Sequence, residues 1–178
     1  MLLVIGATER ELAPVKGART LVCGIGPVEA AAATARALAE EPPDAVLHVG
    51  IAGASGLPLL TLVLGSEAVY CDVSGPLVPA RVLPDAGLLE RLRAVFPDAP
   101  VLPIGTSARV GGAHGMDVEA MEGFAVLRAC ELAGVAAVEV RVVSNEIDEP
   151  DRSRWRFEEA FTALADVLPR LVAGAAVA

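Results

Sequence analysis

The chain has 178 residues, of which 54% are hydrophobic and 3% aromatic, and its formal net charge is −9 at pH 7. This length and apolar content suit one domain with a buried core, so we expect a single domain over residues 1–178 and no disordered chain. The negative charge would repel nucleic acids and anionic membranes, and neither is expected as a partner.

Apolar runs alternate with helical patterns along the first part of the chain. Residues 2–5, 20–23 and 45–49 are short apolar runs that predict strands. The alanine-rich residues 27–41 predict a helix, which ends because two prolines follow it. Residues 50–56 are glycine-rich and predict a loop.

The rest of the chain continues this alternation, which predicts a single-domain, three-layer α/β/α fold with a central mixed, largely parallel sheet. Pro169 is expected to bend or fray the last helix. The predicted strands are residues 63–71, 101–104 and 137–144, and the predicted helices are residues 85–96, 123–132 and 154–172.

Ligands bind sheets of this kind at the carboxyl ends of the strands. Four segments follow predicted strands there, at residues 6–9, 24–26, 50–53 and 144–145. The glycines of these segments match neither the dinucleotide-binding fingerprint nor the phosphate-binding loop. The segments therefore indicate a binding site without a bound cofactor.

Two groups of acidic residues are candidates for this site. Glu9 and Glu11 suit the first turn of a helix, where the helix dipole favours negative charge, but one of them can instead act as a general base in the cleft. Glu119 and Glu122 can both be solvated. Alternatively, a carboxylate in this segment can grip the two ribose hydroxyls, with Met121 as a soft apolar wall for the sugar.

The histidines and cysteines give no metal-ligand pattern. His48 lies in an apolar strand and is expected to be a buried imidazole with its hydrogen bonds satisfied. Cys23, Cys71 and Cys130 are expected to be small buried apolar side chains, since their number and spacing suit no disulfide framework. With neither a signal-peptide start nor a membrane-length apolar run, the sequence predicts a soluble, cytoplasmic protein.

The order of these segments resembles the nucleosidase branch of the purine nucleoside phosphorylase superfamily. This resemblance implies a nucleoside phosphorylase-like fold, an N-glycosyl hydrolase activity on a small-molecule nucleoside, no cofactor or metal, and at least a homodimer. The segments that carry it are residues 6–11, 24–31, 50–53, 121–123 and 141–145.

The resemblance also implies roles for single residues. Glu11 would activate water, Met121 and Glu122 would bind ribose, and Asn145 would contact the base. Arg141 would either support the Asn145 strand and orient Glu122, or pair with Glu119 or Glu139. The expected lining of the pocket adds Ile51, Ala52 and Gly53, and the aromatic side chains available to stack on the base are Tyr70, Phe124, Trp155 and Phe157.

Within the superfamily, Asn145 with the following Asp151, Arg152 and Trp155 looks most like the futalosine hydrolases. An amide can donate hydrogen bonds to the N7 and O6 acceptors of a 6-oxopurine such as hypoxanthine. The expected activity is therefore hydrolysis of the N-ribosidic bond of futalosine in menaquinone biosynthesis. A carboxylate at Glu11 would repel phosphate and so favours hydrolysis over phosphorolysis.

Two alternatives remain open at this point. Methylthioadenosine/S-adenosylhomocysteine nucleosidases usually carry Asp at the Asn145 position, and a nucleoside-binding protein that has lost catalysis would show the same pattern. Trp155 can also be a helix residue that packs on the domain. The distal carboxylate of futalosine could be bound by Arg109 or by Arg81.

Overall fold

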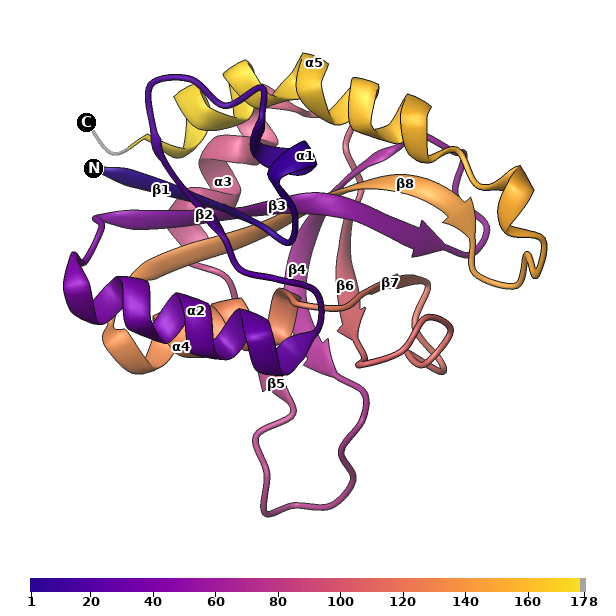
Figure 1. The fold of residues 1–178 in the computed structure, drawn as a ribbon, viewed down its shortest axis with the longest axis horizontal. Helices are drawn as coiled ribbons and strands as arrows, with labels where there is room; N and C mark the ends of the chain where they lie inside the picture. The colour runs from indigo at the N-terminus through magenta and orange to yellow at the C-terminus, as the bar shows by residue number, and fades with distance from the viewer. Residues whose placement is uncertain (177–178) are drawn as a thin grey trace.

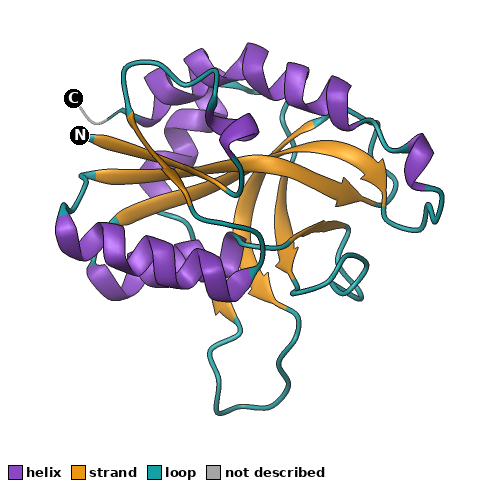
Figure 2. Ribbon diagram, in the orientation of Figure 1, coloured by secondary structure: helices purple, strands orange, loops and turns teal. Residues whose placement is uncertain are grey.

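Eight strands form one mixed sheet with helices on both of its faces in the computed structural model, which describes residues 1–176 (Figure 1). The strands are β1 (Leu2–Gly6), β2 (Arg19–Val22), β3 (Ala45–Ala54), β4 (Leu62–Tyr70), β5 (Arg81–Val82), β6 (Val101–Thr106), β7 (Val118–Ala120) and β8 (Ala136–Glu146). The helices are α1 (Glu9–Leu12), α2 (Pro27–Glu40), α3 (Ala86–Val95), α4 (Gly123–Ala133) and α5 (Phe157–Ala175), with a 3₁₀ turn at Arg152–Arg154 (Figure 2).

The sheet closes on itself through β3. The strand order is β2-β1-β3-β7-β6-β4-β5, and β8 pairs with both β3 and β4. The strands β3, β8, β4, β6 and β7 therefore form a closed ring of five, with β1, β2 and β5 outside it. The pairs β1–β2, β1–β3, β3–β8, β4–β6 and β6–β7 are parallel, whereas β3–β7, β4–β5 and β4–β8 are antiparallel. The predicted α/β fold with a mixed, largely parallel sheet is confirmed.

Two apolar cores lie on opposite faces of the sheet. Alternate residues of β3 supply both, because successive side chains of a strand point to opposite faces. Leu47 packs with the side chains of α3 and α5, whereas Val46 packs with those of α2 and α4. Figure 1 shows the same division, with α1, α3 and α5 above the sheet and α2 and α4 below it.

The helix ends follow local rules. Pro27 begins α2 directly after Gly26, which has a φ of +94°. Asp85 caps α3, since its Oδ1 accepts a hydrogen bond from the Leu88 backbone N–H at 2.8 Å. Gly134 ends α4 in the left-handed conformation, with a φ of +70°. These signals explain why most predicted elements lie within two residues of the observed ones.

Four predictions from the sequence are wrong. The glycine-rich loop expected at residues 50–56 is mostly strand, because β3 continues to Ala54 with β8 on one side and β7 on the other. The closing helix begins at Phe157, and it passes through Pro169 to Ala175. Trp155 therefore lies before that helix rather than in it. Cys71 is only partly buried, unlike Cys23 and Cys130.

No helix among residues 1–176 combines the length and the apolarity that crossing a membrane requires.

Candidate active site

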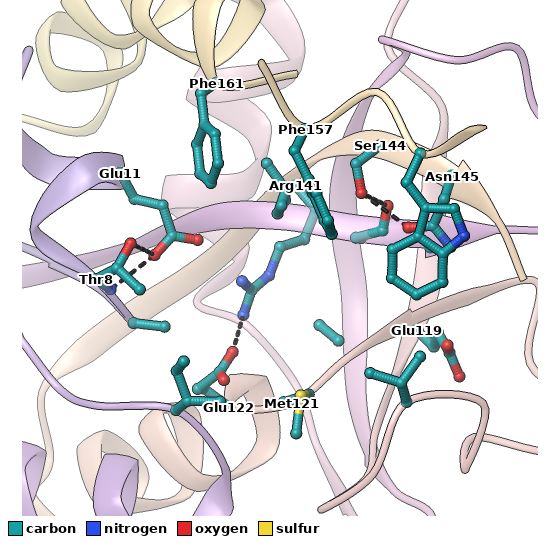
Figure 3. Close-up of a pocket in the computed structure, with 18 of the residues that line it drawn as sticks. Thr8, Glu11, Glu119, Met121, Glu122, Arg141, Ser144, Asn145, Phe157 and Phe161 are labelled. Atoms are coloured by element: carbon teal, nitrogen blue, oxygen red, sulfur yellow. Dashed lines mark hydrogen bonds and ion pairs between the residues drawn. The ribbon is translucent and has the colours of Figure 1, made fainter. Parts of the chain in front are cut away.

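A pocket of about 260 Å³ opens where β1, β3, β7 and β8 end (Figure 3). Its position at the carboxyl ends of the parallel strands agrees with the general rule for such sheets. All the candidate residues meet in it, namely Glu11, Ile51, Ala52, Gly53, Met121, Glu122, Arg141 and Asn145. The other lining residues include Thr8, Ile25, Arg109, Val110, Ser144, Trp155, Phe157 and Phe161.

Glu11 lies both in the first turn of a helix and in the pocket. It lies in the first turn of α1, where its Oε2 accepts hydrogen bonds from the Thr8 backbone N–H at 2.8 Å and from the Thr8 hydroxyl at 3.0 Å. It is also only 5% exposed and lines the pocket. Burial raises the pKa of Glu11, although Arg141 and the Thr8 hydrogen bonds oppose this shift. A carboxylate with a raised pKa is a stronger base, which suits proton abstraction from water.

Arg141 lies under the pocket and joins several acidic residues. Its Nε donates to Glu139 Oε1 at 2.8 Å, and its Nη2 lies 3.5 Å from Glu122 Oε2. Burial alone would lower the pKa of Arg141, but the nearby carboxylates of Glu139, Glu122 and Glu11 raise it. The arginine therefore both orients Glu122 and pairs with Glu139, whereas Glu119 is not among its partners.

His48 completes the environment of this guanidinium. Its Nδ1 lies 3.0 Å from the Ile5 carbonyl oxygen, and its Nε2 lies 2.5 Å from Arg141 Nη2. Because Arg141 can only donate, Nε2 accepts and Nδ1 carries the proton. Burial, followed by the charge of Arg141, holds the pKa of His48 well below its usual value. The predicted buried and satisfied imidazole is confirmed, and the residue also fixes the arginine.

Negative charge is in excess around Arg141. Glu11, Glu122 and Glu139 are 5%, 4% and 1% exposed, so three carboxyl groups share one buried guanidinium. Glu122 is held further by the Gly26 backbone N–H, which donates to its Oε1 at 3.0 Å. Such a fixed negative environment, shielded from water, stabilises a positive charge that develops on a bound sugar.

Gly50 allows this network to assemble. A Cβ atom at Gly50 would lie 2.6 Å from Glu11 Oε1 and closer still to Arg141 Nη1. Only a residue without a side chain lets these two groups approach above β3. The glycine that the sequence analysis assigned to a loop is therefore a strand residue required by packing.

Asn145 is presented by a bulge in β8. Ala52 of β3 pairs with Val143, but the next residue, Gly53, pairs with Asn145, which leaves Ser144 as the extra residue. The Ser144 hydroxyl donates to Asn145 Oδ1 at 2.9 Å, and Asn145 Nδ2 donates to the Glu146 carbonyl at 3.1 Å. One lone pair of the amide oxygen and one N–H of Nδ2 therefore remain for a ligand.

Three aromatic side chains form the side of the pocket next to α5. Trp155 and Phe157, two of the candidates for stacking on the base, pack edge to face with ring centroids 5.4 Å apart, and Phe161 lines the pocket with them. Phe161 was not predicted from the sequence, although its spacing of four from Phe157 puts both on one helix face. The other two candidates do not contribute: Tyr70 and Phe124 stack on each other in a separate groove between α2 and α4.

The two arginines considered for a distal carboxylate lie in different places. Arg109 lines the pocket, whereas Arg81 pairs with Glu67 at 2.6 Å outside it. Glu119 faces the segment that carries Arg109 and accepts hydrogen bonds from the backbone N–H groups of Gly111 at 2.8 Å and Ala113 at 3.4 Å. It is therefore buried rather than solvated, and it supports the pocket wall.

The acidic side chains of the pocket are not arranged as metal ligands. Among residues 1–176, no group of three or more histidine, cysteine, aspartate or glutamate side chains is arranged to hold a metal ion.

A family model and curated relatives match most of the chain. The family model described as the phosphorylase superfamily matches residues 15–176. Futalosine hydrolase of Streptomyces coelicolor is 33% identical, with 85% of this chain and 77% of that protein covered. Futalosine hydrolase of Thermus thermophilus is 34% identical, with 86% and 80% covered.

Solved structures of nucleosidases share the fold. The 5′-methylthioadenosine/S-adenosylhomocysteine nucleosidase of Neisseria meningitidis, in complex with methylthio-immucillin-A, has a TM-score of 0.80 and 26% identity, with 98% of this chain and 97% of that chain covered. Native futalosine hydrolase of Helicobacter pylori has a TM-score of 0.86 and 17% identity, with 97% of each chain covered.

The burial of Glu11 predicts how stability changes with pH. Its folded-state pKa lies above the unfolded value near 4.5, so this group favours the folded state fully below pH 4.5 and loses that contribution as pH rises through the folded pKa. Glu11→Gln keeps the neutral form at every pH. We expect the Tm of Glu11→Gln minus that of the native protein to increase from pH 5 to pH 8. A difference in Tm that stays constant over this range would contradict the raised pKa.

Proposed function

The chain belongs to the phosphorylase superfamily and, within it, to the futalosine hydrolase family, and from this premise we propose that it hydrolyses the N-ribosidic bond of futalosine and releases hypoxanthine. One observation carries the proposal. A single pocket brings together an amide donor, Asn145, and two buried carboxylates, Glu11 and Glu122. These are the groups that the hydrolysis of a 6-oxopurine nucleoside requires.

The reaction passes through a transition state in which the ribose resembles an oxocarbenium ion. Glu122 binds the two ribose hydroxyls, Met121 contacts the sugar, and the excess of carboxylates stabilises the positive charge. The C1′–N9 bond breaks with its electron pair going to the purine, and the oxygen of a water molecule bonds to C1′. Glu11 takes the proton of that water, and Asn145 donates a hydrogen bond to the departing base.

Water rather than phosphate is the proposed nucleophile. A phosphate at the Glu11 position would face a buried carboxylate, and the Arg141 guanidinium is already engaged by Glu139 and Glu122. A dianion in that place would lack a free cationic partner. This supports hydrolysis over phosphorolysis.

A methylthioadenosine/S-adenosylhomocysteine nucleosidase is the alternative. Its support is the 26% identity with the nucleosidase of Neisseria meningitidis over nearly the whole chain. The amide of Asn145 argues against it, because its free N–H can donate to the O6 acceptor of a 6-oxopurine, whereas adenine carries an amine donor at that position.

The proposal includes a role in menaquinone biosynthesis, in the cytoplasm, by a homodimer or a higher homo-oligomer. Support for self-association comes from the apolar groove between α2 and α4, at which Val28 and Leu132 are 77% and 72% exposed. The molar mass in solution tests this part.

Product analysis tests the main proposal. The purified protein is incubated with futalosine, inosine and methylthioadenosine without phosphate, and free base is quantified by chromatography. We expect hypoxanthine from futalosine and little base from the other two. Glu11→Gln should lower kcat by about 10²–10⁴, the usual contribution of a general base, while it still binds hypoxanthine. Adenine from methylthioadenosine would favour the alternative enzyme, and no base from any substrate would favour a binding protein.

Replacement of Asn145 tests base selection. In Asn145→Asp, the ratio of kcat/KM for futalosine to that for methylthioadenosine should fall by roughly tenfold or more, because a carboxyl group can accept from the adenine amine. Asn145→Ala is the matched control: it should weaken both reactions and lower the ratio less than Asn145→Asp does, because it removes the donor without adding an acceptor for the adenine amine. An unchanged ratio in Asn145→Asp would show that another group selects the base.

A further inference from the structure

The segment of residues 107–113 is a turn held at both ends by carboxylates. Asp72 accepts hydrogen bonds from the Ser107 hydroxyl at 2.7 Å and from the Ala108 backbone N–H at 2.6 Å. Glu119 accepts from the backbone N–H groups of Gly111 and Ala113. The residues between these bonds, Arg109 and Val110, line the pocket. The turn therefore presents Arg109 to the pocket from a fixed backbone.

The Arg109 side chain is exposed at the mouth of the pocket, and its guanidinium is free to meet a ligand there. Within residues 1–176, no ion pair or side-chain hydrogen bond joins its guanidinium to another group, and only its backbone N–H donates, to the Ser107 hydroxyl at 3.3 Å. A Cβ atom at Gly112 would lie 2.8 Å from Arg109 Cγ, so the glycine leaves room for the side chain. By contrast, the other pocket-lining arginine, Arg141, is held by Glu139, Glu122 and His48.

The turn lies at the end of the pocket where Asn145 is found. Gly53 of β3 pairs with Glu119 on one side and with Asn145 on the other. A Cβ atom at Gly53 would lie 3.0 Å from Asn145 Nδ2 and 3.3 Å from Glu119 Cγ. Figure 3 shows Asn145 and Glu119 on one side of the pocket and Glu11 on the other. Arg109 is thus supported beside the amide assigned to the base, away from the general base.

We propose, on the basis of the function proposed above, that Arg109 is a second base-binding residue and a catalytic one: its guanidinium contacts the departing 6-oxopurine and stabilises the negative charge that forms on it. When the C1′–N9 bond breaks, the electron pair passes to the purine, which leaves with charge spread over its ring nitrogens and O6 and then takes a proton from solvent. The proton of the attacking water passes to Glu11.

The charge distribution of the pocket matches this bond cleavage. Heterolysis of the N-ribosidic bond leaves positive charge on the ribose and negative charge on the base. Glu11 and Glu122 supply negative charge at the sugar, and Arg109 supplies positive charge in the same pocket as Asn145. Charges of opposite sign at the two ends of the breaking bond lower the barrier. Donors from Arg109 and Asn145 together also suit the acceptors of hypoxanthine better than the amine of adenine.

The test compares Arg109→Gln with the native protein in two measurements. The first is kcat/KM for futalosine, and the second is the Kd of free hypoxanthine, followed by the fluorescence of Trp155, the single tryptophan, which lines the pocket. We expect both to worsen by roughly 10- to 100-fold, the usual effect of a lost charge-assisted hydrogen bond. Arg109→Lys should lie between the two, since it keeps the charge but not the planar donor pair.

Arg81→Gln is the matched control, because its guanidinium pairs with Glu67 outside the pocket and both measurements should be unchanged. A loss of kcat/KM with unchanged hypoxanthine affinity would assign Arg109 to the distal carboxylate of futalosine and overturn the proposal, as would no loss in either measurement. If the native protein releases no base from futalosine, the proposed function fails, whereas the hypoxanthine titration of Arg109→Gln still decides the base contact.

Discussion

The buried guanidinium of Arg141 is the interaction on which the pocket depends. A charge that is 1% exposed requires partners, because the loss of hydration would otherwise cost several kcal/mol. The partners come from separate parts of the chain: His48 from β3, Glu139 from β8 itself, and Glu122 from the start of α4. Satisfying one arginine therefore fixes the relative positions of these elements, and with them the Glu122 carboxylate that is proposed to bind the sugar.

The same network explains why glycine occupies two positions in the chain. The space above Gly50 is occupied by Arg141 and Glu11, and the space beside Gly123 is occupied by the Glu139 carboxylate, so a Cβ atom at either glycine would overlap these groups. The network is also incompletely satisfied, since Glu139 Oε2 has no hydrogen-bond partner within residues 1–176 and burial raises the pKa of Glu139. Unfavourable electrostatics of this kind are common where a protein holds charge for catalysis rather than for stability.

Local patterns predicted most of the helices and strands, because apolar periodicity and capping residues act over a few positions. The failures involve distant partners. Residues 50–54 look like a loop by composition, yet two strands from later in the chain pair with them. The order of motifs along the chain predicted Glu11 and Asn145 as site residues, and both line the pocket. The support of the Arg109 turn by Asp72 and Glu119 could not be predicted, since it joins residues across a folded sheet.

The bulge at Ser144 shows how a single inserted residue divides the pocket into two chemical halves. Up to Val143, residues of β8 pair with β3 in a regular register, in which Arg141 lies opposite Gly50. The extra residue shifts Asn145 opposite Gly53, and successive strand positions face opposite sides. Asn145 is thereby separated from the carboxylates around Arg141 and bonds instead to Ser144 and the Glu146 carbonyl. In a regular strand Asn145, four positions beyond Arg141, would have its side chain on the same side of β8 as the arginine. The bulge therefore sets the direction in which the amide faces.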